Sequence, residues 1–374
     1  MNIKMFKKPI GIYIHIPFCI KKCPYCNFYS VRPEGDLINL YTEALCKEIK
    51  NNAEIYKVSV NSIYLGGGTP ALIGIKNIDK IIKTVEKCFS VLNPEISIEL
   101  NPSCHNTIDF CELKNIGINR VSLGMQSIND FELLNLGRNH TSFDTQKTIY
   151  NLRAVGIDNI SVDIMAAIPN QKDTDLLKSL KFCVDNFIPH VSVYLLKIEK
   201  NTRFFEIKDS LSLPDEDTEA ELYLLSSRFL NSNGYKHYEI SNFCKNGMES
   251  KHNLKYWNCD EYLGFGPSAH SFIKGKRFFY KNSINGFIEN PIQIPDGFGN
   301  YPEEYCMLRL RLADGLEEKE YKTRFNTPIP DIFYKRADKY VNSGLVSISK
   351  QGKGIKLTSK GFLLSNSLIS EIIG

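Results

Sequence analysis

The stretch "GIYIHIPFCIKKCPYCNFYS", residues 11–30, places three cysteines within eight residues, directly after a strand-like run. Cys19, Cys23 and Cys26 have the spacing C-x3-C-x2-C. The remaining members of the 11 cysteines are scattered, and each is more simply explained as a small buried apolar side chain. An odd number of cysteines at this density does not indicate a secreted disulfide scaffold, so we expect reduced thiols, of which only the clustered three are candidate metal ligands.

The overall composition is that of an ordinary soluble chain. The chain has 374 residues, 43% hydrophobic and 24% charged, which favours two domains. Its formal net charge of +4 is small for this length and does not indicate binding to nucleic acid or to a membrane surface. No apolar run reaches the roughly 18–20 residues of a membrane span, and the N-terminal segment lacks the cleavage site of a secretory signal. We therefore expect a cytoplasmic protein.

The first two thirds of the chain alternate strand-like and helix-like segments, which is the pattern of parallel βα units. Six successive units with short strands favour a barrel, or an open part-barrel, over a flat doubly wound sheet, although periodicity alone does not separate the two. The predicted strands cover residues 11–18, 60–67, 95–101, 119–127, 159–167 and 190–198.

Polar side chains share one face of these strands. Side chains alternate between the two faces of a strand, and aliphatic residues such as Ile12 and Ile14 occupy the other face. If the aliphatic faces pack on helices, the polar faces point into an interior that an ordinary barrel fills with branched apolar residues. A polar interior predicts a bound polar ligand. Its residues are Tyr13, His15, Glu99, Gln126, Asp163 and Tyr194.

We predict three segments: a barrel core over residues 1–235, an aromatic- and histidine-rich segment over 236–300, and a helical, winged-helix-like domain over 301–374. The stretch "GLVSISKQGKGIKLTSKGF" predicts a two-stranded wing between helices. From residue 302 onward there are 12 Lys and Arg against 9 Asp and Glu, so no basic stripe supports DNA binding. We expect this domain to be structural or to act as a lid.

Three clustered thiols allow two kinds of metal centre. A structural zinc ion needs four ligands, and His15 is a candidate for the fourth, although closing such a site requires a sharp bend at Pro17. A four-iron cluster is also held by thiolates, usually four, so three would leave one iron open to another ligand. The spacing alone leaves both interpretations open.

The cysteine loop resembles the signature of the radical S-adenosylmethionine (SAM) superfamily, with Tyr25 as the aromatic residue directly before the third cysteine. The segment "YLGGGTP" is similar to the part of that signature that receives the methionine amino group, although a glycine triplet alone indicates only a tight turn. The resemblance implies a partial (β/α)6 TIM-like barrel with a C-terminal α+β extension. It also implies a [4Fe-4S] cluster on Cys19, Cys23 and Cys26, with SAM at the open iron.

Four further segments, "ELNP", "GMQS", "LGRNH" and "SVDI", resemble those that hold SAM in the oxygen-independent coproporphyrinogen oxidase-like branch of this superfamily. A carboxylate can accept hydrogen bonds from ribose hydroxyls, and a guanidinium can bind a carboxylate with two donors. Taken singly, each residue would be explained by a salt bridge or a core hydrogen bond. The SAM-binding residues that the resemblance implies are Tyr13, Phe28, Gly67, Gly68, Thr69, Glu99, Gln126, Arg138 and Asp163.

Within this branch the chain resembles the HemW-type heme chaperones more than the porphyrinogen-oxidising enzymes. The segments "YEISNF", "HNLKYW" and "LGFGPSAHSF" carry this resemblance, and Phe28 stands where the oxidising enzymes usually have a fourth cysteine. The oxidising enzymes also have an N-terminal extension before the strand that leads to the cluster loop. In this chain that strand begins at Gly11. The resemblance implies heme binding, an electron donor, and delivery of heme to acceptor hemoproteins, including respiratory ones that would bring the chain to the membrane periphery.

His252 in "HNLKYW" is the candidate heme ligand. Neutral imidazole is a common axial ligand of heme iron, and Tyr256 and Trp257 could stack on a porphyrin. From spacing alone, a packed hydrogen-bonding histidine is the simpler explanation. Cys244 and Cys259 flank the segment and are alternative ligands.

Two other functions stay open, and one departure from the family affects SAM binding. An oxygen-independent coproporphyrinogen III oxidase would decarboxylate two propionates through a 5′-deoxyadenosyl radical, whereas a zinc-stabilised binding protein would have no such chemistry. In "MAAIPNQ" the chain has Ala167 and Asn170 where related chains have the glycines of "GLPGQ". We expect the added bulk to alter the adenosyl pocket.

Overall fold

The computed structural model describes residues 8–349 and 353–374. Contacts divide the chain into two compact units, each of which brings together segments that are far apart in the sequence. The first unit contains the residues up to 163 together with 197–211 and 260–299. The second contains residues 164–196, 212–259 and 300–374.

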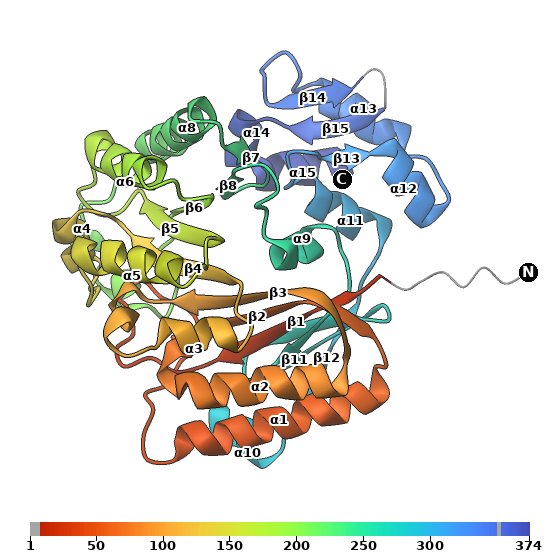
Figure 1. Ribbon diagram of the computed structural model, residues 1–374. Coiled ribbons are helices and arrows are strands. Elements are labelled where there is room, and N and C mark those ends of the chain that lie inside the picture. Colours follow the sequence, from red (N-terminus) through yellow and green to blue (C-terminus); the bar gives the residue numbers. More distant parts are fainter. Residues whose placement is uncertain (1–7, 350–352) are drawn as a thin grey trace, which may run out of the picture. The chain divides into compact units, whose positions relative to one another are not determined.

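The first unit is built on a largely parallel sheet (Figure 1). Strand β1 (Ile10–Ile16) pairs in parallel with β2 (Ser59–Gly67) on one side and with β9 (Tyr262–Phe265) on the other, so β1 does not close a barrel. Next to β2 lie β3 (Ser90–Leu100) and β4 (Arg120–Gln126), in chain order and parallel. The sheet continues beyond β9 with antiparallel strands β10 (His270–Ile273), β11 (Lys276–Tyr280) and β12 (Gln293–Phe298).

Three helices pack together beside this sheet, α1 (Leu37–Ile55), α2 (Gly74–Cys88) and α10 (Ile284–Glu289). In α2, Ile78, Ile81, Ile82 and Val85 are buried. Their three- and four-residue spacing forms one apolar stripe, which explains why this segment is helical and which face it buries.

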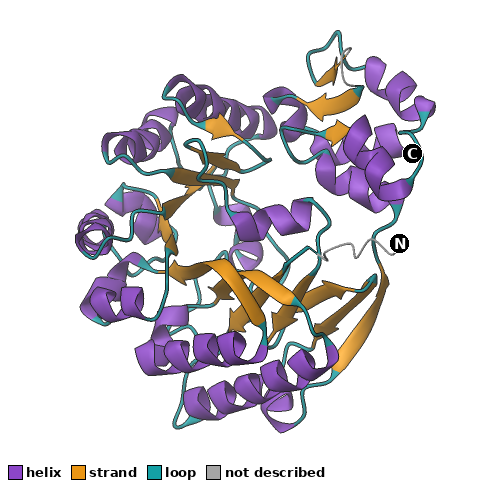
Figure 2. Cartoon of the chain, turned by 45° about the vertical axis from the view of Figure 1, so that its right-hand side comes forward, coloured by secondary structure: helices purple, strands orange, loops and turns teal. Residues whose placement is uncertain are grey.

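Shorter helices follow the remaining strands of the first unit (purple in Figure 2). The 3-10 turns η1 (Pro70–Ile73) and η2 (Pro102–Asn106) directly follow β2 and β3. A capping box between Thr141 and Asp144 starts α5, which fixes where this helix begins. The helices are α3 (Phe110–Asn115), α4 (Asp130–Asn135), α5 (Ser142–Ala154) and α7 (Arg203–Glu206).

The second unit begins within β5 (Ile160–Ala166). Its strand β6 (His190–Leu195) pairs antiparallel with β8 (Asn242–Cys244), which pairs with β7 (Lys236–His237). Helices α6 (Asp173–Asp185) and α8 (Glu216–Ser232) pack against each other.

The end of the second unit is a small winged-helix-like domain. Its sheet has the order β13 (Leu316–Glu317), β15 (Gly354–Leu357), β14 (Val346–Ser349). The two predicted strands of the wing are confirmed, and β13 adds a third that the sequence analysis did not predict. The helices are α11 (Pro302–Arg309), α12 (Glu318–Phe325), α13 (Asp331–Asp338), α14 (Ser359–Leu363) and α15 (Ser365–Ile373).

The fold class predicted from the sequence is confirmed, because all six predicted strands form and open βα units carry the C-terminal extension. The short strands β9 to β12 were not predicted. The division into three segments at residues 235 and 300 stays a prediction.

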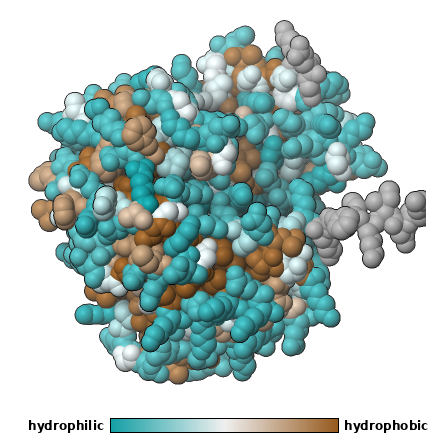
Figure 3. Space-filling model, in the orientation of Figure 1, coloured by the Kyte–Doolittle hydropathy of each residue, from teal (hydrophilic) through white to brown (hydrophobic). Residues whose placement is uncertain are grey.

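Hydrophilic side chains cover most of the face drawn in Figure 3. In the part of the chain that the structure describes, no helix is long and apolar enough to cross a membrane. Four of the large apolar side chains that remain exposed belong to the neighbouring helices α4 and α5: Phe131, Leu134, Phe143 and Tyr150.

Candidate functional site

The three clustered cysteines lie on a loop that leaves β1 and closes on itself through backbone hydrogen bonds. The Cys19 amide donates to the Val31 carbonyl (3.0 Å), and the Val31 amide donates to the Pro17 carbonyl (2.7 Å). The Cys26 amide donates to the Cys23 carbonyl (3.0 Å). All three thiols are free and partly exposed. The loop therefore presents three unpaired thiols on an anchored backbone.

His15, the candidate fourth ligand of a zinc site, already uses both ring nitrogens. Nε2 lies 3.0 Å from the Tyr29 carbonyl oxygen, and Nδ1 lies 3.0 Å from the Tyr13 hydroxyl. Burial lowers the pKa of His15, so the ring is neutral. Because a carbonyl only accepts, Nε2 carries the proton and Nδ1 accepts from Tyr13. His15 is 3% exposed and acts in this conformation as a packed core residue.

No group of three His, Cys, Asp or Glu side chains within residues 8–349 and 353–374 is arranged to hold a single metal ion. A four-iron cluster makes a different demand, because its thiolates bind different iron atoms and do not converge on one. The assignment of the three cysteines as cluster ligands stays a prediction.

The glycine triplet at the end of β2 packs tightly against β1 and its loop. A Cβ on Gly67 would lie 2.5 Å from the His15 ring, and Gly67 has a φ of +112°. A Cβ on Gly68 would lie 2.5 Å from the Phe18 carbonyl oxygen. The amides of Gly68 and Thr69 donate to the carbonyls of Ile16 (2.8 Å) and Phe18 (2.7 Å). These contacts explain the glycines without a ligand, and they bring Thr69 Oγ1 to 3.7 Å from Cys19 Sγ.

Glu99 lies next to the glycine segment. Its carboxylate accepts from the Gly67 amide (3.0 Å) and from the Tyr64 hydroxyl (2.9 Å). Burial, together with the nearby charge of Asp163, raises the pKa of Glu99 to about 7, although these two hydrogen bonds oppose the shift. Tyr13 stacks on Tyr64, with ring centroids 6.2 Å apart, so Tyr13 belongs to the same group of side chains.

Arg138 joins the cysteine loop to β4. Its guanidinium donates to the Gly124 carbonyl (2.9 Å) and to His140 Nδ1 (3.4 Å), and its Nη1 lies 3.5 Å from Cys23 Sγ. Burial and the Arg138 charge lower the pKa of His140 to about 4, and His140 Nε2 donates to the Met125 carbonyl (3.0 Å). Arg138 is therefore directed at the cysteine loop and supported by a neutral histidine.

Gln126 and Asp163 complete the predicted set on the neighbouring strands. A Cβ on Gly124 would lie 3.0 Å from Gln126 Nε2 and 3.5 Å from Arg138 Nη2, so Gly124 leaves room for both side chains. Gln126 has a φ of +66°, an uncommon conformation for a residue with a side chain. Asp163 accepts from Ser122 Oγ at 3.2 Å.

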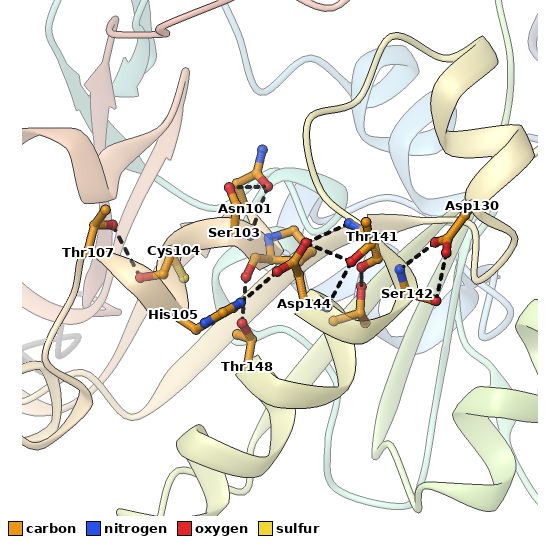
Figure 4. Close-up of polar contacts among 12 residues, drawn as sticks. Asn101, Ser103, Cys104, His105, Thr107, Asp130, Thr141, Ser142, Asp144 and Thr148 are labelled. Carbon is orange, nitrogen blue, oxygen red and sulfur yellow. Dashed lines mark hydrogen bonds and ion pairs between the residues drawn. The ribbon is translucent and has the colours of Figure 1, made fainter.

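A polar network holds the segment that carries Arg138 (Figure 4). His105 Nε2, in η2 after β3, lies 2.7 Å from Asp144 Oδ1. The other oxygen of Asp144 accepts from the Thr141 amide (2.7 Å) and hydroxyl (2.9 Å). The Thr148 hydroxyl also donates to the Pro102 carbonyl (2.6 Å). These contacts join the ends of β3 and of the 138–141 segment.

The predicted aromatic member of the site, Phe28, is 68% exposed. Tyr25, which was not placed in the predicted set, is more closely engaged. It hydrogen-bonds Arg138 and Cys23, and its ring lies 6.2 Å from that of Phe204. The Phe204 amide donates to the Pro24 carbonyl (3.0 Å), which fastens the loop to α7. Its position directly before the third cysteine was the available signal.

Within the first unit, contacts link Glu99 to Gly67, Tyr64 and Tyr13 in one group and Arg138 to Cys23 in another, and Thr69 lies beside Cys19. Tyr194, the remaining polar strand residue, belongs to the second unit and is exposed.

His252 lies in the second unit on α9 (Lys251–Trp257), where it is 1% exposed. Its Nε2 is 2.8 Å from the Tyr256 hydroxyl. Burial lowers the pKa of His252 to about 3, with a smaller contribution from the charge of Lys255. Cys244 and Cys259 are also buried. In this conformation the His252 ring contacts Tyr256 and is not exposed to a ligand. The role of His252 in heme binding stays a prediction.

The departures in "MAAIPNQ" fall at two left-handed backbone positions. Ala167 has a φ of +62° and Asn170 a φ of +61°. Such positions favour glycine, and asparagine tolerates them better than alanine does. The Gln171 side chain accepts from the Ala167 amide (2.8 Å), which holds this turn. Backbone conformation alone therefore favours glycine at both positions.

The comparisons with known proteins agree with this geometry. Residues 13–183 match the profile of the Radical SAM superfamily, and residues 300–364 match that of the HemN C-terminal domain. The structure resembles that of coproporphyrinogen III oxidase (HemN) from Escherichia coli, a radical SAM enzyme, with a TM-score of 0.82 at 20% identity over 99% of this chain and 91% of that one. Fold and cysteine loop together define a radical SAM protein.

Two relatives extend over almost the whole chain. Heme chaperone HemW of Bacillus subtilis is 32% identical, covering 97% of this chain and 98% of the relative. HemW of Buchnera aphidicola subsp. Acyrthosiphon pisum is 36% identical, covering 88% and 89%. The chain belongs to the HemW family of heme chaperones.

Proposed function

We propose that the chain is a heme chaperone that binds a [4Fe-4S] cluster and SAM in its first unit and heme in its second, and that it passes heme to acceptor hemoproteins. The observation that carries the proposal is similarity to heme chaperones over almost the full length, from 30% identity upward. The fold alone does not select this function, because an oxidase has the same fold.

The cysteine loop fits a cluster with an incomplete set of protein ligands. Cys19, Cys23 and Cys26 are free and partly exposed, and His15 is unable to act as a fourth ligand while both its nitrogens are bonded. When bound, a reduced cluster supplies one electron to the sulfonium of SAM. The thiolates hold the cluster, and Arg138 beside Cys23 offsets part of its negative charge.

The surrounding side chains suit the polar groups of SAM. Glu99 and Asp163 provide acceptors for ribose hydroxyls or for the methionine ammonium group. Gln126 provides both a donor and an acceptor, and Arg138 a charged donor for the methionine carboxylate. Thr69 and the backbone at Gly67 and Gly68 lie next to Cys19 and would contact the part of SAM nearest the cluster.

Heme binding would use α9. His252 is held neutral by burial, which is the protonation state that ligates iron, and Tyr256 occupies its Nε2 until a ligand replaces it. Because the His252 side chain is 1% exposed, ligation requires α9, or the residues that cover it, to move. We further propose a cytoplasmic location, an external electron donor, and acceptors that include membrane-associated hemoproteins.

Anaerobic reconstitution followed by heme titration tests the proposal. We expect iron and acid-labile sulfide in the protein, a visible cluster absorbance that Cys19→Ala abolishes, and one-to-one heme uptake that His252→Ala reduces. Zinc without sulfide would instead indicate the zinc-stabilised binding protein. Decarboxylation of coproporphyrinogen III without heme uptake would refute the chaperone and favour the oxidase.

A further inference from the structure

The end of helix α9 is held by arginines of the C-terminal domain. Arg324, at the end of α12, donates from Nη1 to the Asn258 carbonyl (3.1 Å) and from Nη2 to the Cys259 carbonyl (2.5 Å). Both carbonyls follow the last turn of α9, where helix carbonyls lack intrahelical partners. A guanidinium there is favoured by hydrogen bonding and by the helix dipole.

Arg309 binds the same turn from α11. Its Nη1 donates to Asn258 Oδ1, while Nε donates to the Gly315 carbonyl (3.1 Å) and Nη2 pairs with Glu320 (3.2 Å). Arg309 is 6% exposed, and its partner Glu320 is half exposed. The Arg324 guanidinium is itself fixed, because it lies 4.9 Å from the centre of the Tyr305 ring and donates to Asn300 Oδ1 (2.7 Å).

The same domain contacts α9 and the connection at residues 238–240 at two further places. Arg311 lies 6.0 Å from the centre of the Trp257 ring. The backbone around Arg311 pairs with "YEI", since the Ile240 amide donates to the Arg311 carbonyl (3.1 Å) and the Ala313 amide to the Tyr238 carbonyl (2.9 Å). Residues 300–324 therefore contact both the end of α9 and the 238–240 connection.

We propose that Arg309 and Arg324 are positioning residues that hold α9 in the closed conformation in which His252 is buried, and that heme reaches His252 only when this contact opens. The inference rests on the heme-binding role proposed above for α9. Each opening exposes the His252 ring, and heme iron then competes for Nε2 with the Tyr256 hydroxyl, which lies on the same helix. Heme affinity then depends on the fraction of molecules in which α9 is open.

Arg324→Ala tests this inference, and Arg336→Ala is a matched control. Arg336 also donates to helix-terminal carbonyls, those of Ile372 (3.4 Å) and Ile373 (2.9 Å) on α15, but it does not contact α9. We expect amide hydrogen exchange of residues 251–259 to become about tenfold faster in Arg324→Ala, the size expected for loss of a charged hydrogen bond. Arg336→Ala should leave this segment unchanged.

Heme uptake provides the second readout. The rate of appearance of the heme Soret band should rise by the same factor in Arg324→Ala, and adding His252→Ala should remove the gain. Arg324→Lys, which keeps the charge but not the two-carbonyl contact, should be intermediate; it also serves if the alanine variant does not fold.

Unchanged exchange of α9 would overturn the inference, as would faster exchange with unaltered heme uptake. If the wild-type chain and Arg324→Ala both fail to bind heme, the heme function is refuted and the gating with it. Faster exchange in that case would still confirm that Arg324 holds α9, so the two failures are distinguishable.

Discussion

Arg138 Nη1 lies 3.5 Å from Cys23 Sγ, which places a partly buried positive charge against one of three clustered thiols. The sequence resemblance assigns Arg138 to the methionine carboxylate of SAM. The observed contact adds a second role, because the same guanidinium supports the loop that would hold the cluster.

We expect Arg138→Lys to weaken SAM binding about tenfold and to lower cluster content after reconstitution. Lysine keeps the charge but does not contact Gly124, His140 and Cys23 at the same time. Iron and sulfide analysis with calorimetric SAM titration checks this. Arg203→Lys is the control, since Arg203 is exposed on α7 beside the same loop. Equal affinity in wild type and Arg138→Lys would contradict the prediction.

Glu99 predicts a pH dependence of stability. Its pKa in the folded chain is raised from 4.5 to about 7, so between these values the folded chain holds a proton that the unfolded chain has released. The stabilising effect is complete below pH 4.5 and disappears as pH rises through 7. The free energy of unfolding of the wild type should therefore fall by about 3 kcal/mol between pH 4.5 and 7.5, and Glu99→Gln should not show this decrease.

Urea unfolding of wild type and Glu99→Gln across this pH range measures the effect. Glu86→Gln, on the exposed side of α2, controls for the loss of one negative charge. If the free energies of unfolding of wild type and Glu99→Gln change with pH in parallel, Glu99 does not titrate between pH 4.5 and 7.5.

His252 predicts a pH dependence of stability with the opposite sign to that of Glu99. Its pKa falls from 6.5 in the unfolded chain to about 3 in the folded chain, so its stabilising effect is present above pH 6.5 and is lost as pH falls toward 3. His252→Gln should reduce this acid destabilisation by about 2 kcal/mol at pH 5. Thermal unfolding from pH 7.5 to 4.5 measures it, with the exposed His270→Gln as control. A larger acid sensitivity in His252→Gln would refute the assignment.

Ala167→Gly should stabilise the chain or leave it unchanged, although glycine substitutions usually destabilise. The φ of +62° costs alanine about 1 kcal/mol, which offsets the entropy that glycine loses on folding. The neighbouring Ala166, buried and at the end of β5, is the control, because its replacement by glycine should cost about 1 kcal/mol. Equal losses in the two variants, measured by urea unfolding, would contradict the role of backbone strain.

The regular part of the fold could be predicted because its strands have clear apolar faces. Ile12, Ile14 and Ile16 are buried in β1 as their alternation indicates. The strands β9 to β12 have between four and six residues each. Strand β9 pairs with β1, more than 200 residues distant in sequence, and β10 to β12 add to β9 in turn. A local pattern contains no information about such pairing.

The sequence indicated which residues belong to the candidate site, but not the contacts that each of them makes. Glu99 and Asp163 lie near each other, but nothing in the spacing revealed that Arg138 would contact Cys23 or that Tyr25 would be partly buried and Phe28 exposed. For the glycine triplet, the tight-turn and ligand explanations are both compatible with the structure. Close packing on His15 and Phe18 depends on the register of β1 and β2, which emerges only in the folded sheet.

The backbone bonds from Gly68 and Thr69 to Ile16 and Phe18 tie together the two segments that flank the cysteines. Gly68 is the sensitive donor, because a Cβ there would lie 2.5 Å from the Phe18 carbonyl oxygen and 2.9 Å from that of Ile16. Lys21 and Lys22 are exposed and take no part in these bonds, so the spatial relation between thiols and glycines does not depend on them.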